Sequence, residues 1–389
     1  MRRRVLYIPG YDPIPPRRYR ELFKREGADQ AVISGYDLET GARRDRTGFG
    51  WGASLEKDGI RSEAEFEVLI WADIVAGSMG QSIASTYGQL VRTAWAYIGS
   101  GALWRLMKLR RAPVIAALYP IFVLLAQALA ALLAGGLAGW LVSLIATWWV
   151  GLPVMIGIFI LGLNFWRRMD GRIFAYYLMH DYAFTARGGG AYPAALDARI
   201  DAFADRIAEI ASADWDEVLI VGHSSGAYIA VSALARLERA GRLPEKVTFM
   251  SLGHVVPMAS FLPKADALRR DLHDLAASPI FWVDVTAPGD ACCFGLCDPV
   301  AVSCAAPAEG GGPLVLSAAF TRTLSPAKQQ EMRGRWFRLH FQYLCAFDRP
   351  GDYDYFQITA GPLTLRERYE TRSPSPGTIT RPVNKWSYP

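Results

Sequence analysis

Apolar runs of strand length alternate with amphipathic segments of helical length along most of this chain. The apolar runs predict strands over Val5–Ile8, Gln30–Ser34, Trp51–Leu55, Phe66–Ala72, Glu217–Val221, Lys246–Leu252, Pro279–Val285 and Trp336–Leu339. The amphipathic segments predict helices over Arg17–Glu26, Ala194–Ala213, Ser225–Ala240, Lys264–Ala277 and Pro326–Gly334. Strands that alternate with helices indicate an α/β fold, in which helices cover both faces of a mostly parallel sheet.

A long apolar stretch interrupts this alternation. From Ala112 to Trp166 the sequence contains no Asp, Glu, Lys or Arg, and a membrane-spanning helix needs only about 20 apolar residues. The glycines of Gly135–Gly139 predict a turn near the middle, between one spanning helix over Pro113–Ala134 and a second over Trp140–Trp166. The other interpretation, a buried helical hairpin inside a soluble oligomer, leaves the stretch without a polar face for water.

Basic residues flank the apolar stretch on both sides. They are Arg105, Lys108, Arg110 and Arg111 before it, and Arg167 and Arg168 after it. Because basic residues collect on the cytoplasmic side of a membrane, we expect a multi-pass hairpin of two helices, with the α/β domain and both termini in the cytoplasm. Residues 81–111 combine Trp, Leu and basic residues near helical spacing, which fits either a helix in the headgroup layer or a helix packed on the α/β domain.

These patterns divide the chain into consecutive parts. Residues 1–80 form the first part of the α/β domain with an inserted β-hairpin, residues 81–111 form the amphipathic region, and residues 112–166 form the transmembrane hairpin. Residues 167–368 complete the α/β domain. The Pro- and Ser-containing tail of residues 369–389 is expected to be extended or disordered.

Composition narrows the possible partners. The chain of 389 residues is 51% hydrophobic and 20% charged, and its net charge of +5 is too small to indicate nucleic acid. We therefore expect a lipid bilayer as a partner and no nucleic acid, while the oligomeric state stays open. The 5 cysteines, most of them crowded into Cys292–Cys304, fit a reducing compartment better than a disulfide framework. The adjacent pair Cys292-Cys293 does not match the spacing of common zinc sites, so we expect no metal.

The sequence Gly222-His223-Ser224-Ser225-Gly226 lies directly between a predicted strand and a predicted helix. A sharp strand-to-helix turn strains the residue at its centre and requires small neighbours. Such a turn lifts the Ser224 hydroxyl away from the sheet and points the first N–H groups of the helix toward developing negative charge. The alternative is a glycine-bounded turn in which the serine is incidental.

In this setting the motif resembles the nucleophile elbow of the α/β-hydrolase superfamily, over roughly residues 1–35 and 190–345. The chain order of that superfamily is nucleophile, acid, histidine. The resemblance therefore implies Ser224 as the nucleophile, Asp290 as the acid and His340 as the base. The alternative acids are Asp284 and Asp298, and the alternative base is His254.

The resemblance also implies two backbone donors for an oxyanion. One is the N–H of Ser225, and the other is the N–H of Gly10 or Tyr11, in a Pro-Gly loop where the superfamily often has His-Gly. We thus expect a membrane-anchored serine hydrolase that cleaves an acyl ester or thioester, lipid-derived esters included, through an acyl-enzyme and without a metal or organic cofactor. A non-catalytic membrane scaffold on the same fold and an acyltransferase with the same triad are the alternatives.

Overall fold

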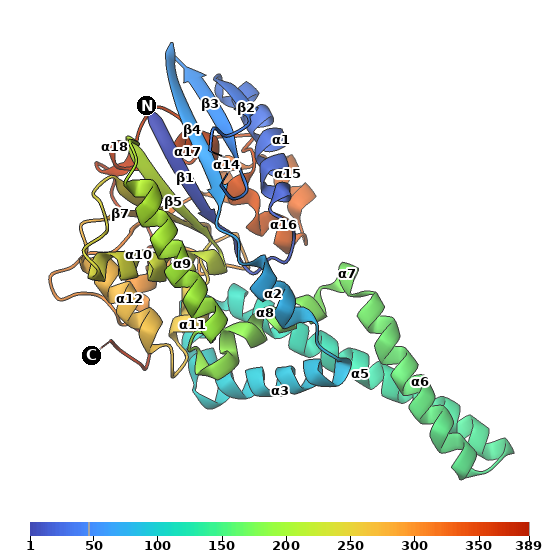
Figure 1. The fold of residues 1–389 in the computed structure, drawn as a ribbon. Helices are drawn as coiled ribbons and strands as arrows, with labels where there is room; N and C mark the ends of the chain where they lie inside the picture. Colours follow the sequence, from blue (N-terminus) through green and yellow to red (C-terminus); the bar gives the residue numbers. More distant parts are fainter. Residues whose placement is uncertain (46, 389) are drawn as a thin grey trace.

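The computed structural model describes residues 1–45 and 47–388. In this part of the chain, 8 strands form one sheet in the order β2-β3-β4-β1-β5-β6-β7-β8. The strands are β1 (Arg2–Ile8), β2 (Asp37–Gly41), β3 (Gly50–Lys57), β4 (Ile60–Val68), β5 (Glu217–His223), β6 (Val247–Leu252), β7 (Phe281–Thr286) and β8 (Leu314–Ser317). The neighbouring strands in the order β4-β1-β5-β6-β7-β8 are parallel. Strand β3 pairs antiparallel with both β2 and β4. The predicted α/β fold with a mostly parallel sheet is therefore confirmed (Figure 1).

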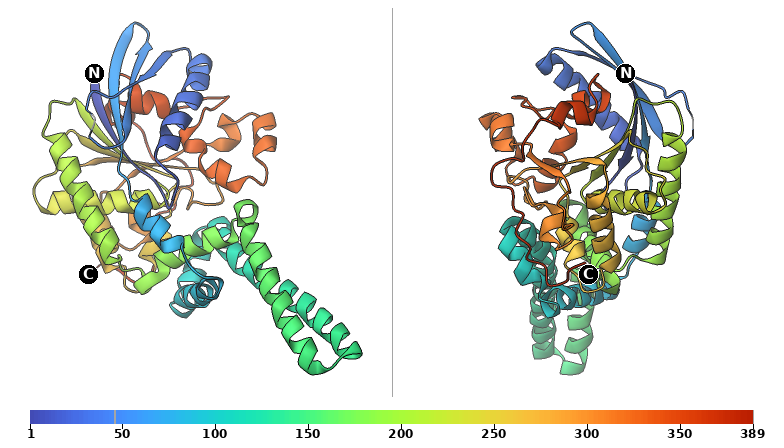
Figure 2. Two further views of the ribbon diagram at one scale, coloured as in Figure 1. Left: turned by 45° about the vertical axis from the view of Figure 1, so that its right-hand side comes forward. Right: turned by 90° about the vertical axis from the view of Figure 1, so that its left-hand side faces the viewer.

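Helices cover both faces of the sheet (Figure 2). Both faces need cover because both are apolar: successive side chains of β1 point to opposite faces, and Leu6 and Ile8 belong to one apolar cluster while Val5 and Tyr7 belong to another. The helices of the first cluster are α9 (Ala194–Ala211), α10 (Ser225–Arg239) and α12 (Asp266–Ala277). The helices of the second are α1 (Arg17–Ser34), α17 (Tyr355–Ala360) and α18 (Leu365–Tyr369). Short helices fill the connections: α11 (Val256–Ser260), α13 (Pro299–Val302), α14 (Phe320–Thr323), α15 (Pro326–Met332), α16 (Trp336–His340), and the single turns η1 (Arg187–Gly189) and η2 (Gln342–Leu344).

Two of the predicted strands are helical. Gln30–Ser34 forms the end of α1, where buried residues continue the helical stripe until Gly35 ends it with a φ of 67°. Trp336–Leu339 lies in α16, and the last strand is β8, a segment of 4 residues that is too short to stand out in the sequence. A short apolar run does not by itself distinguish a strand from a helix, and tertiary packing decided both cases.

The apolar stretch forms two helices that turn later than predicted. Helix α5 (Arg111–Ile145) contains the whole of Gly135–Gly139, and the chain turns at Ala146 and Thr147 before α6 (Trp148–Arg168). Gly135 and Gly139 lie where the helices touch, because a Cβ on Gly139 would come within 2.7 Å of the carbonyl oxygen of Gly151 and one on Gly135 within 2.6 Å of that of Met155. Small residues at such an interface let two helix backbones approach closely, so these glycines serve packing and not the predicted turn.

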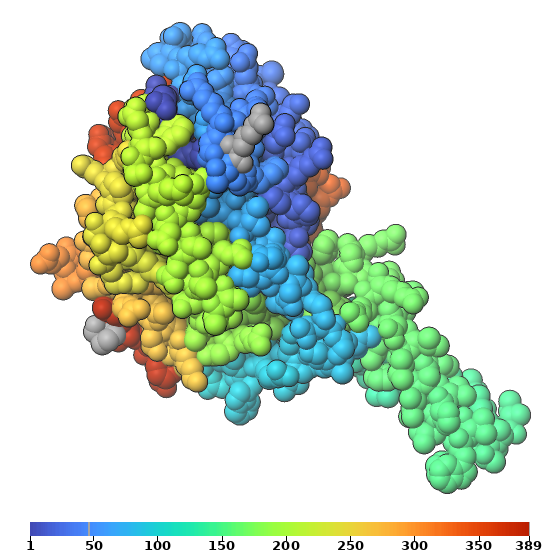
Figure 3. All heavy atoms as spheres, viewed as in Figure 1, coloured from blue at the N-terminus to red at the C-terminus, as the bar shows by residue number. Residues whose placement is uncertain are grey.

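Helices α5 and α6 are long and apolar enough to cross a membrane. In the most apolar window of 18 residues in each helix, 22% and 11% of the residues are buried, whereas the core helix of a soluble protein is mostly buried. The pair projects from the rest of the molecule as a hairpin (Figures 1 and 3). Large apolar side chains along it are exposed, among them Leu133, Trp140 and Phe165.

A layer of helices connects this hairpin to the sheet. It consists of α2 (Ala72–Met79), α3 (Ile83–Gly99), α4 (Ala102–Leu109), α7 (Asp170–Ile173), α8 (Ala175–Ala186) and the start of α5. The layer lies at the end of the sheet toward which β1 and β5 point (Figure 1). The amphipathic region is thus two helices, α3 and α4, and both keep large apolar side chains exposed, with Trp95 at 77% and Trp104 at 58%.

The C-terminal tail is extended as far as residue 388, and residue 389 lies outside the described residues. Ile379 forms a parallel bridge with Cys297, and the side chain of Asn384 donates a hydrogen bond of 3.0 Å to the carbonyl of Ser260. The tail is therefore bound along the loops of the α/β domain, and the expectation of disorder is wrong for these residues.

Candidate active site

Ser224 occupies the strained turn that the motif predicts. It lies between the end of β5 and the start of α10 with a φ of 57° and a ψ of −121°, a conformation that residues other than glycine rarely adopt. A Cβ on Gly222 would come within 2.8 Å of Ala227 Cα, and one on Gly226 would clash with the carbonyl of Ile8. The two glycines are thus required for strand and helix to approach so closely.

The loop after β1 packs directly against this serine. A Cβ on Gly10 would lie 2.9 Å from Ser224 Cβ, so glycine is needed there as well. The N–H groups of Gly10 and Tyr11 donate to no acceptor among the described residues. Ser225 is the first residue of α10, and the N–H of a first helical residue has no partner inside its helix. The candidate oxyanion donors therefore have no acceptor among the described residues, and their residues line the same cavity as Ser224.

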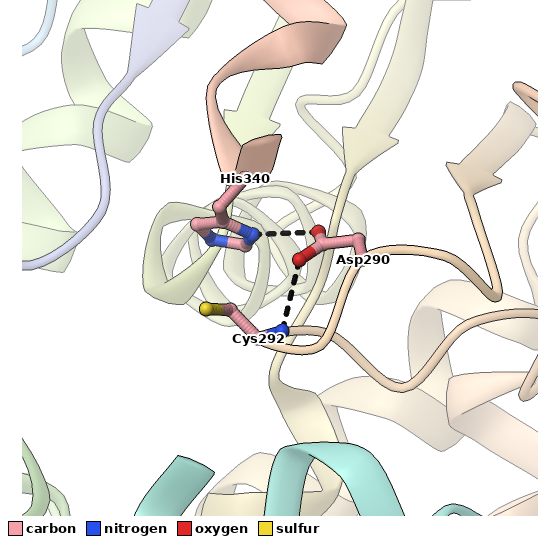
Figure 4. A group of neighbouring side chains, drawn as sticks. All are labelled: Asp290, Cys292 and His340. Atoms are coloured by element: carbon pink, nitrogen blue, oxygen red, sulfur yellow. Dashed lines mark hydrogen bonds and ion pairs between the residues drawn. The ribbon is translucent and has the colours of Figure 1, made fainter. Parts of the chain in front are cut away.

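His340 and Asp290 form a buried pair beside this turn. The Nδ1–H of His340 donates a hydrogen bond of 2.7 Å to Asp290 Oδ2, and the side chains are 7% and 0% exposed (Figure 4). Asp290 lies in the loop after β7, and His340 is the last residue of α16. Burial alone would raise the pKa of Asp290, but the charge and hydrogen bond of His340 outweigh it and hold this pKa below its usual value.

Further donors fix the Asp290 carboxylate from two sides. The N–H of Cys292 donates to Oδ1 over 2.9 Å, and the hydroxyl of Tyr343 donates to Oδ2 over 3.1 Å. These contacts orient the carboxylate, and through it the imidazole of His340. Tyr343 follows His340 by three positions and is brought back to the same carboxylate by η2.

One cavity contains both Ser224 and His340. It measures about 70 Å³, several times the roughly 10–15 Å³ that one water occupies on the same measure. Its lining includes Gly10, Tyr11, Ser225, Cys292 and residues of α8. Among the described residues no hydrogen bond joins the Ser224 hydroxyl to the His340 ring. In ligand-free enzymes this bond is often long and tightens when the substrate binds.

The alternative acids lie in other surroundings. Asp284 is buried within β7, where the Ser251 hydroxyl donates to it over 2.5 Å and burial raises its pKa well above the usual value. Asp298 accepts from the N–H groups of Val300 and Ala301 at the start of α13, as a helix cap does. Neither carboxylate is bonded to the His340 ring.

The alternative base is a buried core histidine. The Nε2–H of His254 donates to the carbonyl of Cys297 over 2.9 Å, and His254 is not among the residues that line the cavity of Ser224. Burial lowers the pKa of His254 to about 4, so its ring is neutral at physiological pH. Of the histidines considered from the sequence, only His340 both lines that cavity and is paired with an acid.

A third side chain, the thiol of Cys292, accompanies the pair. One ligand atom each from Asp290, Cys292 and His340 lies within 4.8 Å of the others, a grouping that a metal ion requires (Figure 4). A metal binds the thiolate form, however, and burial together with the charge of Asp290 raises the pKa of Cys292 well above its usual value. The Nδ1 of His340 is also already engaged with Asp290. The grouping therefore fits a hydrogen-bonded acid and base better than a metal site.

Comparison with known proteins adds no relative. No protein-family model, no curated protein and no solved structure matches this chain. The chemistry of the site therefore rests on its own residues.

Proposed function

We propose that this protein is a membrane-anchored serine hydrolase of the α/β-hydrolase type, which cleaves an acyl ester or thioester. His340 takes the proton of the Ser224 hydroxyl as its oxygen attacks the substrate carbonyl, and Asp290 stabilises the imidazolium that forms. The N–H of Ser225 and that of Tyr11 or Gly10 bind the oxyanion. His340 then protonates the leaving alcohol or thiol, and water, deprotonated by the same ring, releases the acid from Ser224.

The observation that carries this proposal is an acid–base pair whose histidine, oriented by Asp290, shares a cavity with a strained serine. The Nδ1 of His340 is bonded to Asp290, so Nε2 is the nitrogen left to accept a proton. Ser224 lines the cavity that His340 lines, and its φ of 57° is a conformation that folds retain where a side chain must be presented. A scaffold protein has no need of either feature.

The membrane part of the proposal rests on the exposed apolar side chains of the hairpin and on the basic residues at its base. The hairpin of α5 and α6 exposes apolar residues along its length, and Arg110, Arg111, Arg167 and Arg168 lie at its base. Basic residues at both ends favour a cytoplasmic α/β domain. Exposed Trp95 and Trp104, the latter next to Arg105 in α4, fit helices that lie in the headgroup layer. Because Pro113 of α5 also lines the cavity, the site would lie close to the bilayer surface, where lipid-derived esters are concentrated.

Hydrolysis assays on the full chain test this function. Short-chain and long-chain esters of 4-nitrophenol are compared in detergent and in liposomes, for the native protein and for Ser224→Ala. We expect Ser224→Ala to lose activity on both esters, and the liposome form to favour the long-chain ester. Hydrolysis that survives Ser224→Ala would overturn the proposal, and equal rates on both esters everywhere would remove the lipid preference. Activity that needs an added alcohol acceptor would identify an acyltransferase instead.

A further inference from the structure

A second carboxyl group faces the cavity that contains Ser224. It belongs to Asp181, in the middle of α8, and its neighbours along the helix, Tyr177, Leu178, Tyr182 and Thr185, line the same cavity. The mechanism proposed above does not use Asp181. No hydrogen bond or ion pair reaches this carboxyl from any residue of the described chain.

The hydroxyl groups around Asp181 are engaged elsewhere. The Tyr11 hydroxyl is bonded to the Ser78 hydroxyl, and the Tyr177 hydroxyl donates to the carbonyl of Tyr11. The Tyr97 hydroxyl donates to the carbonyl of Met258 over 2.9 Å. The negative charge of Asp181 raises the pKa of each of these tyrosines, after burial as the larger cause, so they lie near it without bonding to it.

Asp181 is half-buried and its carboxyl has no partner among the described residues, so its hydrogen bonds go to water or to a ligand in the cavity. Burial raises the pKa of Asp181 to about 7, and the charge of His340 opposes this only in part. A perturbed carboxyl that lines a cleft next to a nucleophile is typical of a ligand-binding group. Val255 and Met258 add apolar surface to that lining, and polar residues of the lining such as Tyr11, Asp12 and Tyr177 are already hydrogen-bonded elsewhere.

We propose that Asp181 binds a hydrogen-bond donor of the substrate, a free hydroxyl or ammonium group close to the scissile ester. The substrate class is then an ester with a polar donor near the bond that is cleaved, as in a partly acylated polyol or an amino-alcohol ester. This proposal rests on the function proposed above for the same cavity. Asp181 is a specificity-determining residue and takes no part in the transfer of the proton from Ser224.

The test measures binding, so that it does not depend on turnover. The full chain in detergent carries Ser224→Ala, and its dissociation constants are measured for three ligands that have no ester. They are 1-O-hexylglycerol with free hydroxyls, its dimethyl ether without donors, and 2-(hexyloxy)ethylamine with an ammonium group. We expect the dimethyl ether to bind about tenfold or more weakly than at least one of the donor ligands, the size of effect that a lost hydrogen bond to a charged group gives.

Substitution assigns that preference to Asp181. Asp181→Ala should abolish it while binding of the dimethyl ether stays within about twofold, which also shows that the cavity is intact. Asp12→Asn is the matched control, because the Asp12 carboxyl lines the same cavity but accepts bonds from Ile14 and Tyr19. A preference for donor ligands that persists in Asp181→Ala, or that is absent from the parent protein, would overturn the proposal. If Asp181→Ala loses the preference but the native protein hydrolyses no ester, the Asp181 binding site is retained and the hydrolase function is refuted.

Discussion

The ring of His223 is hydrogen-bonded to the backbone of His340, since its Nε2–H donates to the His340 carbonyl over 3.0 Å. A carbonyl oxygen only accepts, so in this contact His223 carries its proton on Nε2. Burial, with the nearby charge of His340, lowers the pKa of His223 to about 3, and the ring is therefore neutral at physiological pH. The variable residue that precedes Ser224 in the motif thus holds the backbone of the proposed base next to this serine.

Removal of the hydrogen bond from His223 to the His340 carbonyl should impair catalysis only because His340 is displaced. We expect His223→Leu to lower kcat/KM for ester hydrolysis by about 10–100-fold, because small displacements of a catalytic group have effects of that size. His223→Gln retains an N–H donor and should recover most of the loss. The check is steady-state kinetics of both variants together with their thermal midpoints. Equal loss of activity in the Leu and Gln variants would contradict a positioning role.

Asparagine substitutions at two buried aspartates distinguish the proposed catalytic acid, Asp290, from a structural residue, Asp284. Asp290→Asn should lower kcat by about 10³–10⁴-fold, because the amide no longer orients the His340 ring or stabilises its charge. Asp284→Asn should leave kcat within a few-fold of the native value, because Asp284 is bonded to Ser251 and neither lines the cavity of Ser224 nor bonds to His340. Both variants are assayed in the same detergent. The reverse ranking would identify Asp284 as the acid.

Buried histidines make stability depend on pH. The pKa of His254 is about 4 in the folded protein and about 6.5 in an unfolded chain. Between these values the unfolded chain binds more protons, so the free energy of unfolding falls as the pH drops below about 6.5. Asp181, whose pKa is raised to about 7, has the opposite slope over this range, so the effect of His254 is measured as a difference between two proteins.

The comparison uses His254→Gln, which retains a donor for the carbonyl of Cys297. From pH 7 to pH 4.5 the native protein should lose about 2 kcal/mol more free energy of unfolding than the variant. Denaturant titrations of the full chain in detergent at both pH values give this difference. Parallel pH profiles for the two proteins would show that folding does not lower the pKa of His254 and would contradict the prediction.

The glycines of the hairpin offer a matched pair of substitutions. A Cβ on Gly139 would approach the Gly151 carbonyl within 2.7 Å, whereas one on Gly136 has nothing within 4 Å. Gly139→Leu should therefore destabilise the pairing of α5 and α6 by about 1–3 kcal/mol, as overpacking does, and Gly136→Leu should have little effect. Unfolding by SDS, followed by the fluorescence of the hairpin tryptophans, reports the difference. Similar curves for both variants would contradict this packing.

The sequence identifies the local features of this molecule and misses those that depend on packing. The turn at Ser224 is predictable because an apolar run, small neighbours and a helical pattern lie next to one another. Asp290 and His340 follow from chain order, although His340 ends a helix and not the predicted strand. His340 is the one histidine that follows the strand preceding Asp290, so it is the candidate base whichever element contains it.

Other features depend on contacts between distant segments. The glycine-rich segment of α5 has the sequence pattern of a turn. Only the contact of Gly135 and Gly139 with α6 explains why these glycines lie inside a helix. The hydrogen bonds from His223 to His340 and from Tyr343 to Asp290 join residues far apart in the chain. Asp181 lines a cavity that forms only when distant segments pack together. No periodicity or motif signals such relationships.

The most direct test of the account is the reaction of Ser224 with a fluorophosphonate. The full chain in detergent is treated with the reagent, and the modified peptide is located by mass spectrometry, for the native protein, for His340→Asn and for His254→Asn. We expect the adduct on Ser224 in the native protein and in His254→Asn, and a rate lower by about 10³-fold or more in His340→Asn, which lacks the base. An unmodified Ser224, or equal rates in the native protein and His340→Asn, would contradict the claim that His340 activates this serine.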